Sequence, residues 1–272
     1  MGYIIAIAGK GGTGKTTVAA LIVRIIRERK LGSILAVDAD PNSNLSEALG
    51  MEVKETIGSV LDEIASQPEK IPSGMSKDRF IEYRVQTIVA EAEGFDILVM
   101  GRPEGPGCYC YVNNVLRNIV GKLIEDYDYV VIDNEAGFEH FSRRTTRATD
   151  ALLVVSDATP MGLKAAKRIS DLVKELDIKT KKNLLIINCY DSRKQQLFWN
   201  YIGMPKRDSE ETLHSAKDIR KERTKDLGFD YIGNIPVDNE ITKLSLDGSS
   251  LIKLDNDAVS LEALRKLGDK IW

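Results

Sequence analysis

The segment GKGGTGKT, Gly9–Thr16, constrains the fold of this chain more than any other stretch. It follows a short apolar run at 3–9 and precedes a helix-like segment at 15–30. Every fixed position of the pattern G-x-x-x-x-G-K-[ST] is filled. In that pattern, glycines let backbone N–H groups surround phosphate oxygens, and the following helix adds a favourable dipole. A chance glycine-rich turn needs neither the strand nor the helix, so the segment predicts a phosphate-binding loop.

Two residues at the start of the predicted helix have specific expected roles in this loop. Lys15 is expected to reach the β- and γ-phosphates of a nucleotide and to act in catalysis, and the Thr16 hydroxyl is expected to help hold Mg²⁺. The residues predicted to contact the nucleotide here are Gly11, Gly12, Thr13, Gly14, Lys15, Thr16 and Thr17.

The rest of the chain alternates short apolar runs with longer helix-like segments. The runs are apolar almost throughout, as expected for strands of a parallel sheet with helices on both faces. We predict an α/β fold with a doubly wound, mostly parallel sheet that binds ligands at the carboxyl ends of its strands. The predicted strands are 3–9, 33–38, 95–101, 129–134, 151–157, 183–188 and 230–236, and the main helices are 15–30, 112–127, 161–176 and 257–271.

Length and composition fit one P-loop ATPase domain over residues 1–272, with 43% hydrophobic residues. A net charge of −3 gives no general attraction to nucleic acid or to an acidic membrane. Three cysteines do not make a disulfide framework. The start of the chain has no leader-like segment, and no run of about 18 apolar residues is present. We therefore expect a cytoplasmic protein without a nucleic-acid or membrane partner.

The stretch 191–226 interrupts this alternation. It has 9 Lys/Arg against 7 Asp/Glu, and mixed signs favour a solvated helical excursion over a nucleic-acid patch. The aromatic residues in LFWNY, at 197–201, either pack on the body of the protein or anchor a partner. The sequence leaves both alternatives open.

Lys10 is a second lysine inside the phosphate loop. With it, the loop resembles the deviant Walker A group, which includes MinD and ParA ATPases, nitrogenase iron protein and arsenite-pump ATPases. The resemblance implies that Mg-ATP is the ligand. It also implies a homodimer in which Lys10 reaches across to the partner's nucleotide and takes part in catalysis.

Carboxylates follow two of the predicted strands. AVDADPNSNL at 36–45 resembles the first switch of the same ATPase group, which implies that Asp38 holds the Mg²⁺ hydration shell and that Asp40 orients or activates the attacking water. Residues at i and i+2 of a strand point the same way, which suits this arrangement. Asp133 lies near the predicted strand end within YVVIDNEAG at 129–137, where an ordinary turn is an equal alternative. In a P-loop chain it resembles the Walker B carboxylate of the magnesium site.

Resemblance to the same group also implies a site for the base. Asn188, which ends the run NLLIIN, resembles an asparagine that contacts adenine. The segment IPVDNEI at 235–241 resembles a loop that closes over the base, with Pro236 and Val237 against it.

Cys108 and Cys110 form a Cys-x-Cys pair inside GPGCYCYV. By themselves they favour small buried thiols or a redox pair over a metal site. The flanking glycines and prolines favour an accessible surface loop, where thiolates are available to a soft metal ion.

Together, KGGTGKTT, DADPNSNL, GCYC and DNEAGFEHFSRR resemble the CooC-type ATPases. These are nickel-insertion metallochaperones that mature carbon monoxide dehydrogenase, with relatives that serve acetyl-CoA synthase. The resemblance implies such a nickel enzyme as client. In a two-fold dimer, four thiolates from two Cys108/Cys110 pairs would hold one Ni²⁺ or Zn²⁺.

Two other functions remain open at this point. One is a MinD/ParA-like positioning ATPase, although the C-terminal segment SLEALRKLGDKIW has only modest cationic character. The other is an iron–sulfur-dependent ATPase reductase. Cys189 adjoins Asn188 and suits a structural role, which disfavours the reductase. His140 suits either a relay between the nucleotide and the metal or an ordinary surface position.

Overall fold

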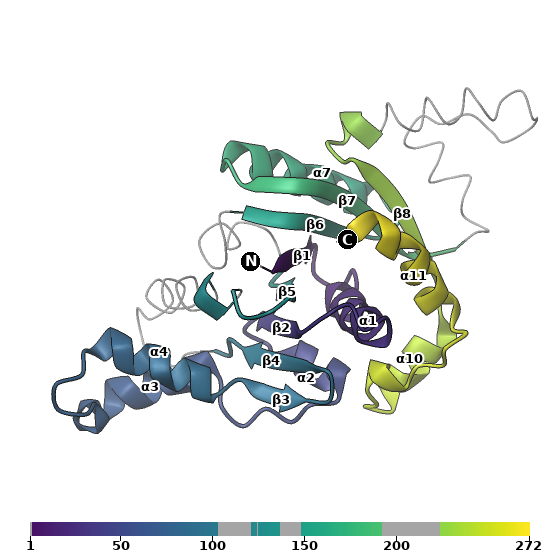
Figure 1. The fold of residues 1–272 in the computed structure, drawn as a ribbon. Coiled ribbons are helices and arrows are strands. Elements are labelled where there is room, and N and C mark those ends of the chain that lie inside the picture. The colour runs from purple at the N-terminus through teal and green to yellow at the C-terminus, as the bar shows by residue number, and fades with distance from the viewer. Residues whose placement is uncertain (1, 103–120, 124, 137–147, 192–223) are drawn as a thin grey trace, which may run out of the picture.

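The computed structural model describes residues 2–102, 121–123, 125–136, 148–191 and 224–272. Its centre is an eight-stranded sheet with the order β3-β4-β2-β5-β1-β6-β7-β8, parallel except for β3 (Figure 1). The strands are β1 Tyr3–Gly9, β2 Ile34–Ala39, β3 Ala90–Ala92, β4 Phe95–Val99, β5 Tyr129–Asn134, β6 Ala148–Ser156, β7 Lys179–Tyr190 and β8 Tyr231–Pro236.

Helices cover both faces of this sheet, as the apolar runs predict. Ile5 and Ile7 of β1 pack with α1, α2 and α11, whereas Ile4 and Ala6 face the cores under α3, α4 and α7. The helices are α1 Lys15–Glu28, α2 Asn44–Leu49, α3 Ile57–Ser66, α4 Lys77–Thr87, α7 Pro160–Glu175, α10 Asn239–Leu246 and α11 Val259–Ile271, with 3₁₀ turns η1 Pro68–Lys70 and η3 Leu251–Lys253.

The sheet differs from the predicted one mainly at its edges. The antiparallel strand β3 was not predicted, because three residues are too short to produce a pattern. β7 begins at Lys179, before the predicted 183, because its polar first residues continue the ladder with β6. Much of the predicted helix 112–127 and of the excursion 191–226 lies outside the described residues.

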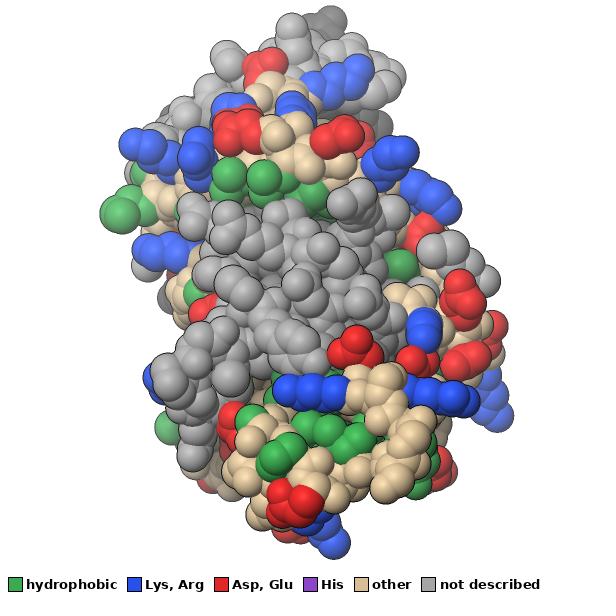
Figure 2. All heavy atoms as spheres, turned by 90° about the vertical axis from the view of Figure 1, so that its left-hand side faces the viewer, with side chains coloured by type: hydrophobic (Ala, Val, Ile, Leu, Met, Phe, Trp, Pro, Cys, Tyr) green, Lys and Arg blue, Asp and Glu red, His purple; other side chains and the backbone are tan. Residues whose placement is uncertain are grey.

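The surface around α3 and α4 carries both signs of charge. Figure 2 shows this side of the molecule, with Lys and Arg side chains interspersed with Asp and Glu around hydrophobic ones in the described part. Of the described helices, none has the length and apolar character that a membrane span requires.

The order of the strands decides which loops meet. β5 lies between β2 and β1, so Asp133 stands opposite both Asp38 and Ile7 in the parallel ladders. Parallel strands end at one edge of a sheet, so the segments that follow β1, β2 and β5 meet there.

Candidate nucleotide-binding site

The loop between β1 and α1 has a defined backbone conformation. Thr13 donates from Oγ1 to the Lys10 carbonyl at 2.8 Å, and Val18 donates from its N–H to the Gly14 carbonyl at 3.0 Å. Gly12 and Gly14 have φ values of 78° and 88°. Because residues with a side chain rarely adopt these left-handed backbone angles, the loop needs glycine at both positions.

Lys15 and Thr16 lie at the first turn of α1. Lys15 is buried, with only 7% exposure. Thr16 donates from Oγ1 to Asp133 Oδ2 at 2.6 Å. The other oxygen, Asp133 Oδ1, is buried and has no hydrogen-bond partner among the described residues. A buried acceptor without a partner is costly unless a ligand satisfies it.

Asp38 and Asp133 form a pair of buried carboxylates on neighbouring strands. Asp38 accepts from the backbone N–H of Asp40 at 3.2 Å and of Leu45 at 2.9 Å. Burial raises the pKa of Asp38 to about 7, and the Asp133 carboxylate adds to the rise. Burial also raises the pKa of Asp133 to about 6, against the Thr16 hydrogen bond and the Lys15 charge. Two buried acids side by side favour a bound cation.

These groups fit Mg²⁺ when a nucleotide is bound. Mg²⁺ prefers oxygen ligands and is usually held by one or two carboxylates together with substrate phosphates and water. Thr16, Asp38 and Asp133 supply a hydroxyl and two carboxylates, and Asp133 Oδ1 is the acceptor that lacks a partner. The predicted magnesium ligands are therefore brought together.

Asp40 and Lys10 lie at the more open part of the site. Asp40 Oδ1 accepts from the backbone N–H and from the side-chain amide of Asn42, both at 2.9 Å, which fixes the orientation of the carboxylate. Lys10 is exposed beside Gly11 and Gly12. Their roles in water activation and across a dimer remain predictions.

Asn188 lies at the carboxyl end of β7 and is brought to the same loop. Its Nδ2 donates to the Thr13 carbonyl at 2.9 Å. Pro236 and Val237 follow at the end of β8, where Val237 donates from its N–H to the Tyr190 carbonyl at 3.3 Å. The predicted contacts of these three residues with a base stay predictions.

Sequence reasoning missed Asn134 as part of the site. Asn134 Nδ2 donates to the Ile7 carbonyl at 2.8 Å, and the side chain is buried next to Asp133. It joins the ends of β5 and β1 just before the phosphate loop. The only signal in the sequence is an amide directly after the acidic strand end.

The predicted cysteine site cannot be compared with these contacts, because Cys108, Cys110 and His140 lie outside the described residues. Within the described ranges, no cluster of three or more His, Cys, Asp or Glu side chains forms a metal site. Burial and the nearby Asp157 carboxylate raise the pKa of the Cys189 thiol. A protonated thiol is a poor metal ligand.

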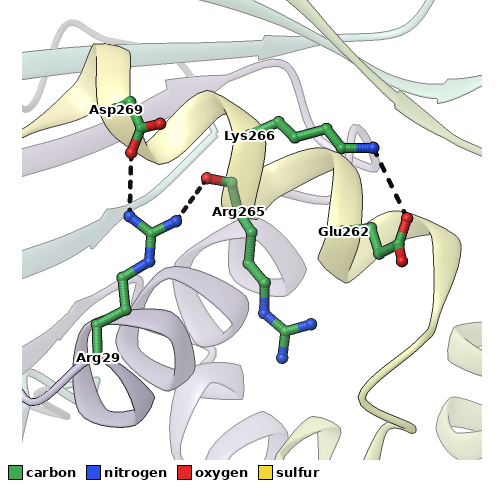
Figure 3. Close-up of a pocket in the computed structure, with 5 residues that line it drawn as sticks. All are labelled: Arg29, Glu262, Arg265, Lys266 and Asp269. Carbon is green, nitrogen blue, oxygen red and sulfur yellow. Dashed lines mark hydrogen bonds and ion pairs between the residues drawn. The ribbon is translucent and has the colours of Figure 1, made fainter.

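A separate cavity of about 380 Å³ lies between the end of α1 and α11 (Figure 3). Its cations are already paired: Arg29 with Asp269 at 3.1 Å, Lys266 with Glu262 at 3.7 Å, and Arg265 with Glu28 at 2.7 Å. Arg29 follows the last residue of α1, at the opposite end from the phosphate loop. We do not assign this cavity to the nucleotide.

Comparisons with known proteins agree with this geometry. The AAA_31 family model, described as an AAA domain, matches residues 2–186. An uncharacterized ATP-binding protein of Methanocaldococcus jannaschii is 40% identical over 270 residues, which cover 98% of each chain. The carbon monoxide dehydrogenase accessory protein CooC of Rhodospirillum rubrum is 32% identical over 197 residues, 65% of this chain and 71% of that protein.

A solved structure is similar over nearly the whole chain. The septum site-determining protein MinD of Pyrococcus horikoshii, complexed with Mg-ADP, has a TM-score of 0.64 at 22% identity. The similarity covers 99% of this chain and 96% of that one. The predicted α/β, doubly wound, mostly parallel fold is confirmed.

Proposed function

Since this chain belongs to the AAA_31 family and is a P-loop ATP hydrolase, we propose that its ATPase cycle drives nickel insertion into a carbon monoxide dehydrogenase or an acetyl-CoA synthase. The observation that supports this most is the similarity to a carbon monoxide dehydrogenase accessory protein. The sequence adds the Cys-x-Cys pair at Cys108 and Cys110. The protein would be a metallochaperone with nickel as its cargo.

In this proposal the phosphate loop and Lys15 hold the triphosphate, and Asp40 orients a water molecule for attack on the γ-phosphorus. The water oxygen forms the new bond to phosphorus, the bond to the β-phosphate oxygen breaks, and the water protons leave with the products ADP and phosphate. Mg²⁺, held by Thr16, Asp38 and Asp133, would neutralise phosphate charge. The hydrogen bond from the half-buried Thr16 hydroxyl to the buried Asp133 carboxylate supports this division of roles.

The metal site needs two copies of the chain. Cys108 and Cys110 give two thiolates, whereas a closed tetrahedral site has four ligands. A two-fold dimer with Lys10 at the shared nucleotide face would bring two such pairs together. Zn²⁺ would compete with Ni²⁺ there, because these ions prefer similar ligands.

The metal content of purified protein tests this function. We expect about one Ni²⁺ or Zn²⁺ per two chains, with sulfur ligands at roughly 2.3 Å for zinc. Cys108→Ser and Cys110→Ser should each lose the metal and client activation while they keep ATP hydrolysis. Cys189→Ser is the matched control and should keep all three properties.

Other outcomes would select another function. One metal ion per isolated chain, or ligands that are mainly nitrogen and oxygen, would contradict the shared thiolate site. An iron–sulfur spectrum in anaerobically purified protein would favour the reductase. No bound metal, together with binding to lipid vesicles or DNA, would favour a positioning ATPase.

A further inference from the structure

The end of β7 departs from regular strand geometry beside the nucleotide site. In the ladder with β8, Ile187 pairs with Asn234, but the next pair is Tyr190 with Pro236. Three steps along β7 therefore match two steps along β8, which leaves one extra residue in β7. Cys189, which lies between these two pairs, has a φ of 51°. An extra residue with a local kink is a β-bulge, and bulges next to active sites redirect side chains.

The bulge contains Asn188, whose side chain meets the phosphate loop. Asn188 is only 7% exposed, and its Nδ2 donates to the Thr13 carbonyl at 2.9 Å. The contact is close on the loop side as well: a Cβ added to Gly14 would lie 2.2 Å from Asn188 Nδ2. The glycine at 14 therefore makes room for this amide.

The hydrogen bond fixes the direction of a backbone N–H group. The Thr13 carbonyl and the Gly14 N–H belong to one planar trans peptide unit, in which they point in opposite directions. When Asn188 holds the carbonyl on its own side, the Gly14 N–H must point away from Asn188. This N–H belongs to the loop that surrounds phosphate oxygens in proteins with this motif.

We propose that Asn188 is a positioning residue for the triphosphate: through the Thr13 carbonyl, it sets the phosphate loop in its binding conformation whichever base the ligand has. The β7 bulge at Asn188 and Cys189 is the device that aims its amide. This inference rests on the ATP site alone and is independent of the proposed nickel delivery. It differs from the predicted adenine contact, because its effect does not require a base.

A ligand without a base separates the two roles. We would measure the affinity of Mg-ATP and of Mg-tripolyphosphate by calorimetry for the unaltered chain and for Asn188→Ala. Loss of one buried hydrogen bond should weaken both ligands by a similar factor, about tenfold, or about 1.4 kcal/mol. Asn183→Ala, on the same strand but without a side-chain bond to the loop, should leave both affinities unchanged.

Three results would overturn the proposal. In the first, Asn188→Ala weakens Mg-ATP but not Mg-tripolyphosphate, which makes Asn188 a base contact only. In the second, the thermal midpoint falls while the folded variant binds both ligands normally, which makes the role merely structural. In the third, the unaltered chain does not bind Mg-tripolyphosphate. The proposal requires such binding, because a loop already in its binding conformation needs no base.

A second variant guards against misfolding of the first. Asn188→Asp keeps the shape of the side chain but replaces the donor with an oxygen that repels the Thr13 carbonyl. Mg-tripolyphosphate should bind this variant at least as weakly as it binds Asn188→Ala. Unchanged affinity would contradict the proposal.

The bulge itself is tested at Cys189, which is exposed. Cys189→Val should weaken Mg-tripolyphosphate binding, because a β-branched residue disfavours positive φ and would shift Asn188. Cys189→Gly adopts this backbone freely and should bind normally. Equal affinities in the Val and Gly variants would show that the bulge does not position Asn188.

Discussion

At the scale of single residues, the site concentrates polar groups that are costly without a ligand. Asp38 and Asp133 are 0% and 1% exposed, and they stand side by side in the ladder of β2 and β5. Neither carboxylate forms an ion pair with a lysine or arginine in the described part of the chain. Asp133 instead accepts a hydrogen bond from the Thr16 hydroxyl. Such groups lower folding stability, and proteins keep them where a ligand completes them. Asp40, with its carboxylate outside this buried pair, has a different expected role.

Asp40→Asn should still bind Mg-ATP but hydrolyse it about 10² to 10⁴-fold more slowly. The asparagine keeps the shape of the side chain and an oxygen that accepts from Asn42. It lacks the negative charge of the carboxylate that orients water. Steady-state phosphate release, with nucleotide affinity measured in parallel, checks this. Asp247→Asn removes an equivalent exposed charge beyond α10 and should hydrolyse ATP normally. A normal rate in Asp40→Asn would remove Asp40 from catalysis.

At the scale of elements, one carboxylate joins the two C-terminal helices to the end of β8. Asp238 caps α10 by accepting from the Glu240 N–H at 3.0 Å. It also accepts from the N–H of Ser260 at 3.1 Å and from its Oγ at 2.7 Å. Ser260 is fully buried in α11. Asp238 therefore holds the loop predicted to cover the base against the first turns of both helices.

Asp238→Ala should lower the free energy of unfolding by about 2 kcal/mol, because it removes a helix cap and leaves the Ser260 hydroxyl without this acceptor. Chemical denaturation at pH 7 measures the loss. Asp257→Ala, at an exposed position in the same region, should change stability little.

The effect should also depend on pH. Burial raises the pKa of Asp238, but the hydrogen bonds from Ser260 and the backbone N–H groups outweigh it, so the pKa lies below its ordinary value of 3.8. A group with a depressed folded pKa stabilises the protein above the unfolded pKa, and this contribution is lost as pH falls through the folded pKa. The difference in free energy of unfolding between the unaltered chain and Asp238→Ala should therefore be largest near pH 6 and become smaller below about pH 4. A gap that widens toward low pH would contradict this reading of the contacts.

At the scale of the whole molecule, the proposed function joins two sites that the sequence places in separate loops. The proposed metal site needs two chains, and Lys10 would link the nucleotide to the same dimer. Any ligand that favours the dimer must then favour the metal site, and the coupling between ligands must be reciprocal.

Nucleotide should therefore change metal affinity in the unaltered chain but not in Lys10→Ala, which should remain monomeric. Metal affinity is measured without nucleotide, with ADP and with a non-hydrolysable ATP analogue, and light scattering gives the mass. Lys54→Ala removes a different exposed lysine and should behave as the unaltered chain does. Nucleotide-dependent metal affinity in monomeric Lys10→Ala would exclude coupling through the dimer.

The sequence by itself determined the features that depend on neighbouring residues. Glycines at fixed positions between an apolar run and a helix predict the phosphate loop, because backbone freedom and helix dipoles are local properties. Apolar runs without alternation predict buried parallel strands for the same reason. These local rules correctly predicted the strands β1, β2 and β5 and the helix α1. The roles of the acidic ends of β2 and β5 came from the resemblance to known ATPases.

Only the tertiary structure decided how distant segments meet. The insertion of β5 between β2 and β1 places Asp133 beside Asp38 and Thr16, and no spacing in the sequence encodes that order. Asn188 was assigned to the base by resemblance, yet its amide donates to Thr13, 175 positions away in the chain. That contact depends on a bulge in the ladder of β7 and β8. Strand order and register minimise the free energy of the whole packed sheet, so they are not properties of any one segment.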